Sequence, residues 1–241
     1  MLLSQLLILS IAVGLGFYVQ TVVGFAAALI SLPILLNGFS MAQSIALLSV
    51  LFLIFSLALT FRNRQHIDRL LVSEMVLGIL LGLMLGIFVI KYADGLILKR
   101  ALGIFLLLYV AYSRLDVKQV TQPKWAGTMF GFAGGMFSGM FSSGGPVYVA
   151  FINTRLKQPH VVRATIIGTL AVADFIKIPV LAFSGILTWD VLRFVVMSMP
   201  AFAIAIYLGN RTHHRVNERI MKILISLLLV ISGVMLIMAK S

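Results

Sequence analysis

The chain has 241 residues, of which 61% are hydrophobic and only 11% are charged, and its mean hydropathy is +1.10. A soluble domain averages roughly 25% charged residues, so this composition excludes an ordinary water-soluble fold. The net charge of +12 does not indicate a nucleic-acid partner, because the cations form short clusters between apolar segments, where Lys and Arg usually report membrane orientation. The absence of cysteine excludes disulfides and thiolate metal sites.

The first apolar stretch, residues 2–36, is too long for a single crossing. As one helix it would span roughly 50 Å, against a hydrocarbon core of about 30 Å. Gln20, Thr21 and Gly24 interrupt it. We therefore expect two short helices folded back on each other, joined by irregular backbone that survives at membrane depth only where protein or a water-filled cavity satisfies it. The first residues lack a basic region and a cleavage site, so we expect a retained membrane segment.

The rest of the chain suggests a duplication. Three plainer apolar segments follow the opening one, and the longest polar stretch, 113–124, divides the chain nearly in half. A second Gly-rich segment then opens the second half and is again followed by three plainer segments. Gly16 to Met41 spans as many residues as Gly134 to Pro159, which gives an offset of 118 between the halves.

These patterns predict an all-α integral membrane protein with two inverted repeats. Each repeat has a doubled-back opening segment plus three transmembrane helices, which makes eight spans if the opening segments are counted once, or up to ten helices. Repeat 1 covers 1–115, a linker covers 116–123, and repeat 2 covers 124–241. Inverted repeats are common in secondary transporters, whose sites lie between broken helices near the midplane.

The distribution of cations supports the doubled-back arrangement. With eight simple spans, Lys and Arg divide almost evenly between the two sides. If each opening segment doubles back, thirteen cations lie on one side, in the polar breaks at 62–69, 113–124, 153–163 and 210–222. Five lie on the other: Lys91, Lys99, Arg100, Arg193 and Lys240. The positive-inside rule then places the larger group in the cytoplasm, and both termini with the loops at 91–99 and 184–190 outside.

The run FSGMFSSGGPVYVAFI at 137–152 is the strongest local motif. Consecutive Ser and Gly residues free backbone N–H groups, and the N-terminus of the following helix adds partial positive charge, so the run suits an anion. We expect Ser138 and the stretch from Ser142 to Gly145 to contact substrate, with Gly144 where the ligand approaches closely and in a conformation that glycine tolerates best. Gly131, Gly134, Gly135 and Gly139 instead favour close helix packing. In the first half, Gln20 and Thr21 either contact a ligand or cap a broken helix.

Asp174 and Lys177 lie three residues apart on one face of a helix expected over roughly 160–183. Ionisable side chains at that depth are costly and usually functional. Lys177 could hold an anion or tether Asp174, and Asp174 could carry a proton. The alternative is a self-neutralising pair that holds helices together. The offset of 118 relates Asp174 to Ser56, so any charge mechanism differs between the halves.

Other candidate residues are weaker. Arg163 lies three turns before Asp174 and is expected either at the cytoplasmic mouth or as a snorkelling surface cation. The four histidines fall in predicted loops, so we expect no metal site: His66, His160, His213 and His214. No predicted span contains a His to activate a serine, which argues against an intramembrane serine hydrolase. No phosphate-binding loop for ATP is present.

The paired opening motifs, QTVVGFAAALISLPIL and GGMFSGMFSSGGPVYVAFI, together with the tract VVRATIIGTLAV, resemble the TauE/SafE family of membrane permeases over essentially the whole chain. Membership would imply transport of sulfite, organic sulfonates or related carboxylates. Ala26 and Ala27 stand where glycines are common in that family, which leaves the part of the first half in binding open.

The motifs and the resemblance together predict a permease, not an enzyme, that moves a small sulfur-containing anion across the cytoplasmic membrane by proton-coupled secondary transport. A membrane scaffold or assembly factor is the main alternative. We expect the substrate and the bilayer as partners, no cofactor, and leave a homodimer open. Asp174 is the predicted coupling residue. The predicted substrate-binding residues are Gln20, Thr21, Gly24, Ser138, Ser142, Ser143, Gly144, Gly145 and Lys177.

Overall fold

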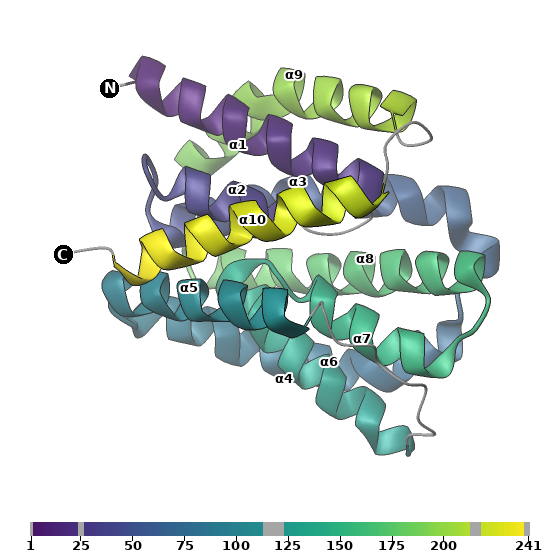
Figure 1. The fold of residues 1–241 in the computed structure, drawn as a ribbon. Helices are drawn as coiled ribbons and strands as arrows, with labels where there is room; N and C mark the ends of the chain where they lie inside the picture. Colours follow the sequence, from purple (N-terminus) through teal and green to yellow (C-terminus); the bar gives the residue numbers. More distant parts are fainter. Residues whose placement is uncertain (1, 24–26, 113–122, 213–217, 239–241) are drawn as a thin grey trace. The chain divides into compact units, whose positions relative to one another are not determined.

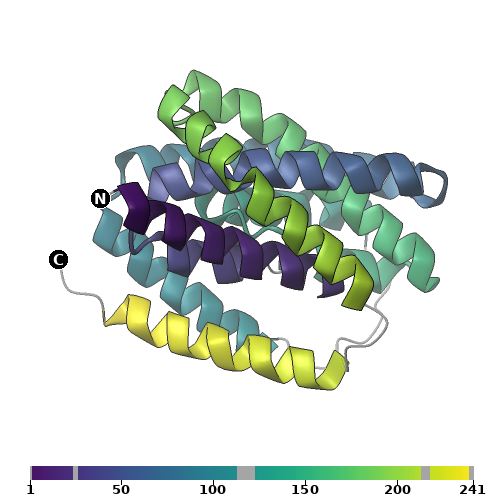
Figure 2. The same ribbon diagram turned by 90° about the horizontal axis from the view of Figure 1, so that it is seen from above.

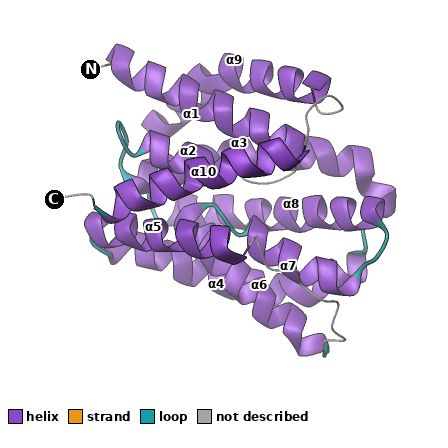
Figure 3. Cartoon of the chain, viewed as in Figure 1, coloured by secondary structure: helices purple, strands orange, loops and turns teal. Residues whose placement is uncertain are grey.

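The structure is a computed structural model, and it describes residues 2–23, 27–112, 123–212 and 218–238. In these residues the chain forms ten α-helices and one short 3₁₀ helix, without a strand (Figures 1 and 3). The predicted all-α class is therefore confirmed. Five helices are long and apolar enough to cross a bilayer, and they lie at Leu3–Val22, Met41–Phe61, Arg69–Tyr92, Pro159–Phe183 and Trp189–Thr212.

Both opening segments are broken into two helices, as predicted. The first half opens with α1 (Leu2–Val23) and α2 (Ala27–Leu35), and the second with α6 (Lys124–Phe141) and α7 (Gly145–Arg155). The predicted linker falls mostly on residues outside the described part of the chain. The remaining helices are α3 (Met41–Asn63), α4 (Arg69–Tyr92), α5 (Gly95–Tyr112), α8 (Pro159–Phe183), α9 (Trp189–Thr212) and α10 (Glu218–Ile237), with the 3₁₀ helix η1 at Arg64–His66.

Corresponding helix ends of the two halves lie at one constant spacing. The ends of α1 and α6, the starts of α2 and α7, and the starts of α3 and α8 are each 118 residues apart, the offset expected from the sequence. The chain also divides into two compact units, each of which draws on both halves. Unit 1 contains α1, α2, α5, α9 and α10 with the first residues of α3, and unit 2 contains the rest of α3, η1, α4, α6, α7 and α8.

In unit 1, α2 folds back along α1. The Ser31 hydroxyl donates a hydrogen bond to the Ala12 carbonyl at 2.7 Å, and Gly16 leaves room for Ser31, because a β-carbon there would overlap that hydroxyl. The helix α9 packs on the other side of α1, where the rings of Phe17 and Phe202 meet edge to face at 4.7 Å.

The helices α5 and α10 form the second pair of unit 1. They run alongside each other, as the yellow α10 and its teal neighbour show when seen from above (Figure 2). Gly103 and Gly233 lie at the crossing, where a β-carbon on Gly103 would come within 2.6 Å of the Gly233 carbonyl oxygen. Small residues thus allow the two backbones to approach closely.

The main packing interface of unit 2 joins the Gly-rich α6 to α4, which lie side by side (Figure 1). The glycines at every fourth position of α4 contact the α6 backbone, and those of α6 contact the α4 backbone. A β-carbon on Gly135 would lie 2.5 Å from the Ile79 carbonyl oxygen, and one on Gly139 would lie 3.0 Å from the Cα of Gly86. The interpretation of Gly131, Gly135 and Gly139 as packing residues is therefore confirmed.

The helix α7 folds back along α6, as α2 does along α1. The Tyr148 ring fills the space beside Gly134, where no β-carbon would fit, and the rings of Phe130 and Phe151 stack at 5.2 Å. Tyr148 and Phe151 are fully buried and join a core with Met75 of α4 and Ala173 of α8. The core thus fixes the break between α6 and α7 against α4 and α8.

Candidate functional site

The break between α6 and α7 consists of Ser142, Ser143 and Gly144. Ser142 ends α6 with φ 53° and ψ 23°, which is the left-handed region, and its N–H donates to the Ser138 carbonyl at 2.9 Å. It is the only described residue other than glycine with a positive φ. A side chain costs roughly 1–2 kcal/mol in that conformation, so the surrounding contacts must hold Ser142 there.

Gly144 differs from the sequence-based expectation. We expected a conformation that glycine tolerates best, but its φ of −69° and ψ of −20° suit any residue. The reason for glycine is space, because a β-carbon at 144 would overlap the Gly134 carbonyl and lie 3.0 Å from the Tyr148 ring. A bulky residue at 144 would therefore disturb packing whether or not a ligand approaches.

Lys177 reaches the break from α8. Its ammonium donates to the Ser138 carbonyl at 2.6 Å and to the Ser142 hydroxyl at 2.8 Å, and the side chain is fully buried. An ammonium has three hydrogens to donate. The third ammonium hydrogen has no acceptor in the described part of the chain. The amide N–H groups of Gly144 and Gly145, at the start of α7, have no acceptor there either. Several donors thus converge at one buried break.

Asp174 has a different partner from Lys177. The Ser56 hydroxyl donates to the Asp174 carboxylate at 3.1 Å, and both residues are buried. No ion pair joins Asp174 to Lys177 within the described structure. The two side chains thus make no direct ion pair, and the alternative that they only balance each other's charge is tested below. Instead, α8 directs its carboxylate to α3 and its ammonium to the helix break.

The other predicted site residues have local partners. In unit 1 the Gln20 side-chain oxygen accepts the N–H of Ala27 at 3.0 Å, which caps the start of α2. The Thr21 hydroxyl donates to the Phe17 carbonyl of its own helix at 2.7 Å. Gly24 lies outside the described residues. In unit 2 the buried Ser143 donates to the Phe141 carbonyl at 3.1 Å, and Arg163 is exposed on α8.

The histidines were expected in loops and not at a metal site. His66 belongs to η1 and His160 to the first turn of α8, so the loop assignment of these two was wrong. Their rings meet edge to face at 5.3 Å. No group of three His, Asp or Glu side chains among the described residues could hold a metal ion. His213 and His214 lie outside the part that the structure describes.

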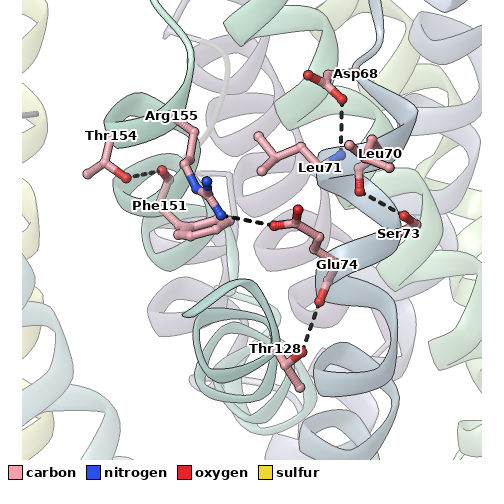
Figure 4. A network of polar contacts seen from close by, with 9 residues as sticks. All are labelled: Asp68, Leu70, Leu71, Ser73, Glu74, Thr128, Phe151, Thr154 and Arg155. Atoms are coloured by element: carbon pink, nitrogen blue, oxygen red, sulfur yellow. Dashed lines mark hydrogen bonds and ion pairs between the residues drawn. The ribbon is translucent and has the colours of Figure 1, made fainter. Parts of the chain in front are cut away.

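Two features of unit 2 escaped the sequence reasoning. Tyr148 is fully buried, and its hydroxyl has no hydrogen-bond partner in the described structure. The only sequence hint was its position four residues after Gly144, which puts Tyr148 on the same face of α7 as the break. The second is the ion pair of Glu74 on α4 with Arg155 at the end of α7, at 3.1 Å (Figure 4). Thr128 also donates to the Glu74 carbonyl, so this contact ties α4, α6 and α7 together.

Comparison with known proteins decides the family. The chain matches the family described as "Sulfite exporter TauE/SafE" over residues 8–236. The chain belongs to the TauE/SafE family. The "Probable sulfite/organosulfonate exporter TauE" of Cupriavidus necator is 29% identical to it over 217 residues, which cover 87% of this chain and 85% of the relative. No solved structure matches.

Membership in the TauE/SafE family makes the chain a multi-pass membrane transporter and not an enzyme. It therefore argues against both the hydrolase and the scaffold alternatives.

Proposed function

We propose that this transporter exports a small sulfur oxyanion, sulfite or an organic sulfonate, from the cytoplasm across the cytoplasmic membrane, and that the break between α6 and α7 binds it. The observation that carries the proposal is the buried Lys177 ammonium beside Ser142, with one hydrogen left to donate. A buried cation with an unused donor favours an anionic ligand. The name of the Cupriavidus necator relative supports the substrate class.

The substrate takes up donors that the free protein leaves unused. Its oxygens accept from the Lys177 ammonium, from the N–H groups of Gly144 and Gly145, and from the Ser142 hydroxyl, whereas Ser143 joins them by giving up its bond to the Phe141 carbonyl. The N-terminus of α7 adds partial positive charge at the same place. The Ser138 carbonyl holds the ammonium in position at 2.6 Å.

The equivalent break between α1 and α2 contributes to binding through Gln20, Thr21 and Gly24. The Gln20 side-chain oxygen already accepts the first N–H of α2. Gln20 therefore contributes by holding the start of α2 in place. Arg163 is a cation at the proposed cytoplasmic mouth, where it would raise the local concentration of anions.

Transport is coupled to protons through Asp174. The buried carboxylate has one hydroxyl donor, Ser56, and lies one helical turn from Lys177. When an anion engages the ammonium, the attraction between Lys177 and the carboxylate weakens, and the neutral, protonated Asp174 becomes more favourable. Release of the anion reverses the balance, which links one substrate to one proton.

The transporter consists of two inverted repeats with both termini outside the cell. The constant spacing of 118 residues between corresponding helix ends supports the repeat. The pairing of helices supports it as well, because α6 packs against α4 and its counterpart α1 packs against α9, the counterpart of α4. The cation distribution in the sequence supports the orientation.

Flux measurements in proteoliposomes test the proposal. Labelled sulfite and a labelled sulfonate should both show saturable flux, each should compete with the other, and chloride should compete poorly. Lys177→Met should abolish the saturable flux, whereas Lys177→Arg should retain part of it. The matched control is Lys157→Met, which removes an exposed cation just after α7. Normal saturable flux in a folded Lys177→Met protein would show that the anion binds elsewhere.

A further inference from the structure

A separate cavity of about 310 Å³ lies within unit 2, where the end of α3, η1 and the start of α4 meet α8. Arg64, Arg69 and Ser73 line it together with apolar residues that include Val72 and Val172. The two arginines are exposed, whereas Val72 is buried. The cavity is thus charged where it meets the surface and apolar farther in.

The two guanidinium groups are available for a ligand. Neither Arg64 nor Arg69 makes a hydrogen bond or an ion pair with any described residue. The nearest acidic residue in the chain, Asp68, uses its carboxylate to cap α4, where it accepts the Leu71 N–H at 3.0 Å. Guanidinium groups present a planar fork of donors that matches the oxygens of sulfonates and carboxylates.

Thr60 of α3 also lines the cavity, but its hydroxyl oxygen is buried and is not an accessible contact for a ligand. Ser56, one helical turn before Thr60, donates to Asp174.

The size of the cavity indicates the class of ligand. A volume of about 310 Å³ corresponds to roughly ten water molecules at about 30 Å³ each, which exceeds the needs of an inorganic anion. The apolar wall at Val72 and Val172 would cover a short carbon chain. Gly168 keeps the α8 side open, because a β-carbon there would lie 3.0 Å from the Ile67 side chain.

We propose that this cavity is a second, peripheral binding site for a small organic oxyanion. Arg64 and Arg69 hold its acidic head group, and Val72 and Val172 cover its carbon chain. The choice of an organosulfonate as that ligand rests on the proposed function. The site itself does not, since it is separate from the break between α6 and α7.

Thiol labelling of this cysteine-free chain tests the site directly. Ser73→Cys places a thiol on the cavity wall, and Gln65→Cys places one on η1 beside Arg64 but outside the cavity. Each purified variant is labelled with 2-sulfonatoethyl methanethiosulfonate, itself an organosulfonate, and with its trimethylammonium analogue. The ratio of the anionic to the cationic labelling rate should be about tenfold higher for Ser73→Cys than for Gln65→Cys, since a lined cavity concentrates anions more than a surface does.

Two further arms complete the test. Adding Arg64→Gln and Arg69→Gln should bring the Ser73→Cys ratio down to the Gln65→Cys level, and methanesulfonate should slow both reagents only in Ser73→Cys.

The results separate this proposal from the previous one. In the Lys177→Met background, transport should be lost while the labelling ratio and the protection persist. Equal ratios at the two positions, or the absence of protection by methanesulfonate, would overturn the peripheral site and leave the break between α6 and α7 untouched.

Discussion

Ser56 donates a hydrogen bond to the carboxylate of Asp174 at 3.1 Å, and the two residues are 118 positions apart. The same spacing separates the ends of α1 and α6 and the starts of α3 and α8. If the halves are the inverted repeats proposed above, Ser56 and Asp174 occupy equivalent positions and lie at the axis that relates the halves. The hydrogen bond then joins two corresponding helices, α3 and α8, through different side chains.

Exchanging these two residues tests that relationship. Ser56→Ala should lower the free energy of unfolding by about 1.5–3 kcal/mol, the range for a hydrogen bond to a charged group. Ser56→Asp alone should cost more, because it places two carboxylates together in a buried place. The double exchange, Ser56→Asp with Asp174→Ser, restores the same bond with its roles reversed.

Thermal unfolding in detergent measures the outcome. The exchanged protein should melt closer to the wild type than the Ser56→Asp protein does. A double exchange no more stable than the Ser56→Asp single change would mean that the two positions are not equivalent, and the axis would have to lie elsewhere.

The sequence predicted the helical class, the broken opening segments and the offset between halves because these depend on hydropathy and on the placement of Gly and Pro. It also indicated Ser138, Ser142 and Lys177, but not that they bond one another, since residues 138 and 177 lie on helices whose packing is set by tertiary contacts. The role of Gly144 was misjudged for the same reason. Composition shows that a glycine is flexible, whereas only the neighbouring Tyr148 ring and Gly134 carbonyl show that it must be small. Nothing in the sequence relates Glu74 to Arg155, because their ion pair depends on how α4 and α7 pack.

The helix break is best tested at Ser142, because Gly144→Val would fail through packing alone. Ser142→Ala removes the acceptor of the Lys177 bond but keeps a side chain in the left-handed region, so transport should fall most. Ser142→Gly relieves the backbone and should recover about 0.5–1 kcal/mol of stability. Ser142→Asn tolerates the left-handed region and supplies an oxygen acceptor, so it should recover the most activity.

The expected order of transport rates is therefore Asn above Gly above Ala at position 142. Flux into proteoliposomes at equal protein content, with melting temperatures measured in parallel, gives the order. Equal rates for the three variants would indicate that the Lys177 contact to Ser142 has no part in transport.

Close packing of α4 on α6 predicts a second effect on stability. Gly82→Ala would place a β-carbon against the Phe132 carbonyl and 2.7 Å from the Met136 nitrogen, so the two helices must separate. Overpacking of this kind should cost about 1–3 kcal/mol. The matched control is Gly14→Ala on α1, where nothing lies within 4 Å, and which should gain about 0.5–1 kcal/mol from reduced backbone freedom. Equal melting temperatures for the two variants would contradict the packing.

The proposed orientation predicts which loops reach the cell exterior. Single cysteines replace Asn63, Gln119 and Asn217, which belong to three of the four breaks that this orientation places in the cytoplasm; Asn63 is the last residue of α3. All three should resist impermeant thiol reagents in intact cells and react after permeabilisation. A cysteine at Ser184, after α8, should react in intact cells and serves as the control. Labelling of the first three in intact cells would refute the doubled-back topology with outside termini.

The coupling role of Asp174 is the sharpest remaining question, and Asp174→Asn addresses it. The amide keeps the shape of the carboxyl group and can still accept the Ser56 hydrogen bond, but it cannot exchange a proton. We expect the response of transport to a pH gradient to vanish while exchange of labelled for unlabelled substrate continues. If Asp174 only balances the charge of Lys177, Asp174→Asn should instead lower the melting temperature by leaving a buried cation uncompensated, and adding Lys177→Met should restore it. Gradient-driven flux, exchange and melting temperature measured on the same preparations distinguish the two cases. A well-folded Asp174→Asn protein that still responds fully to a pH gradient would exclude Asp174 as the proton carrier.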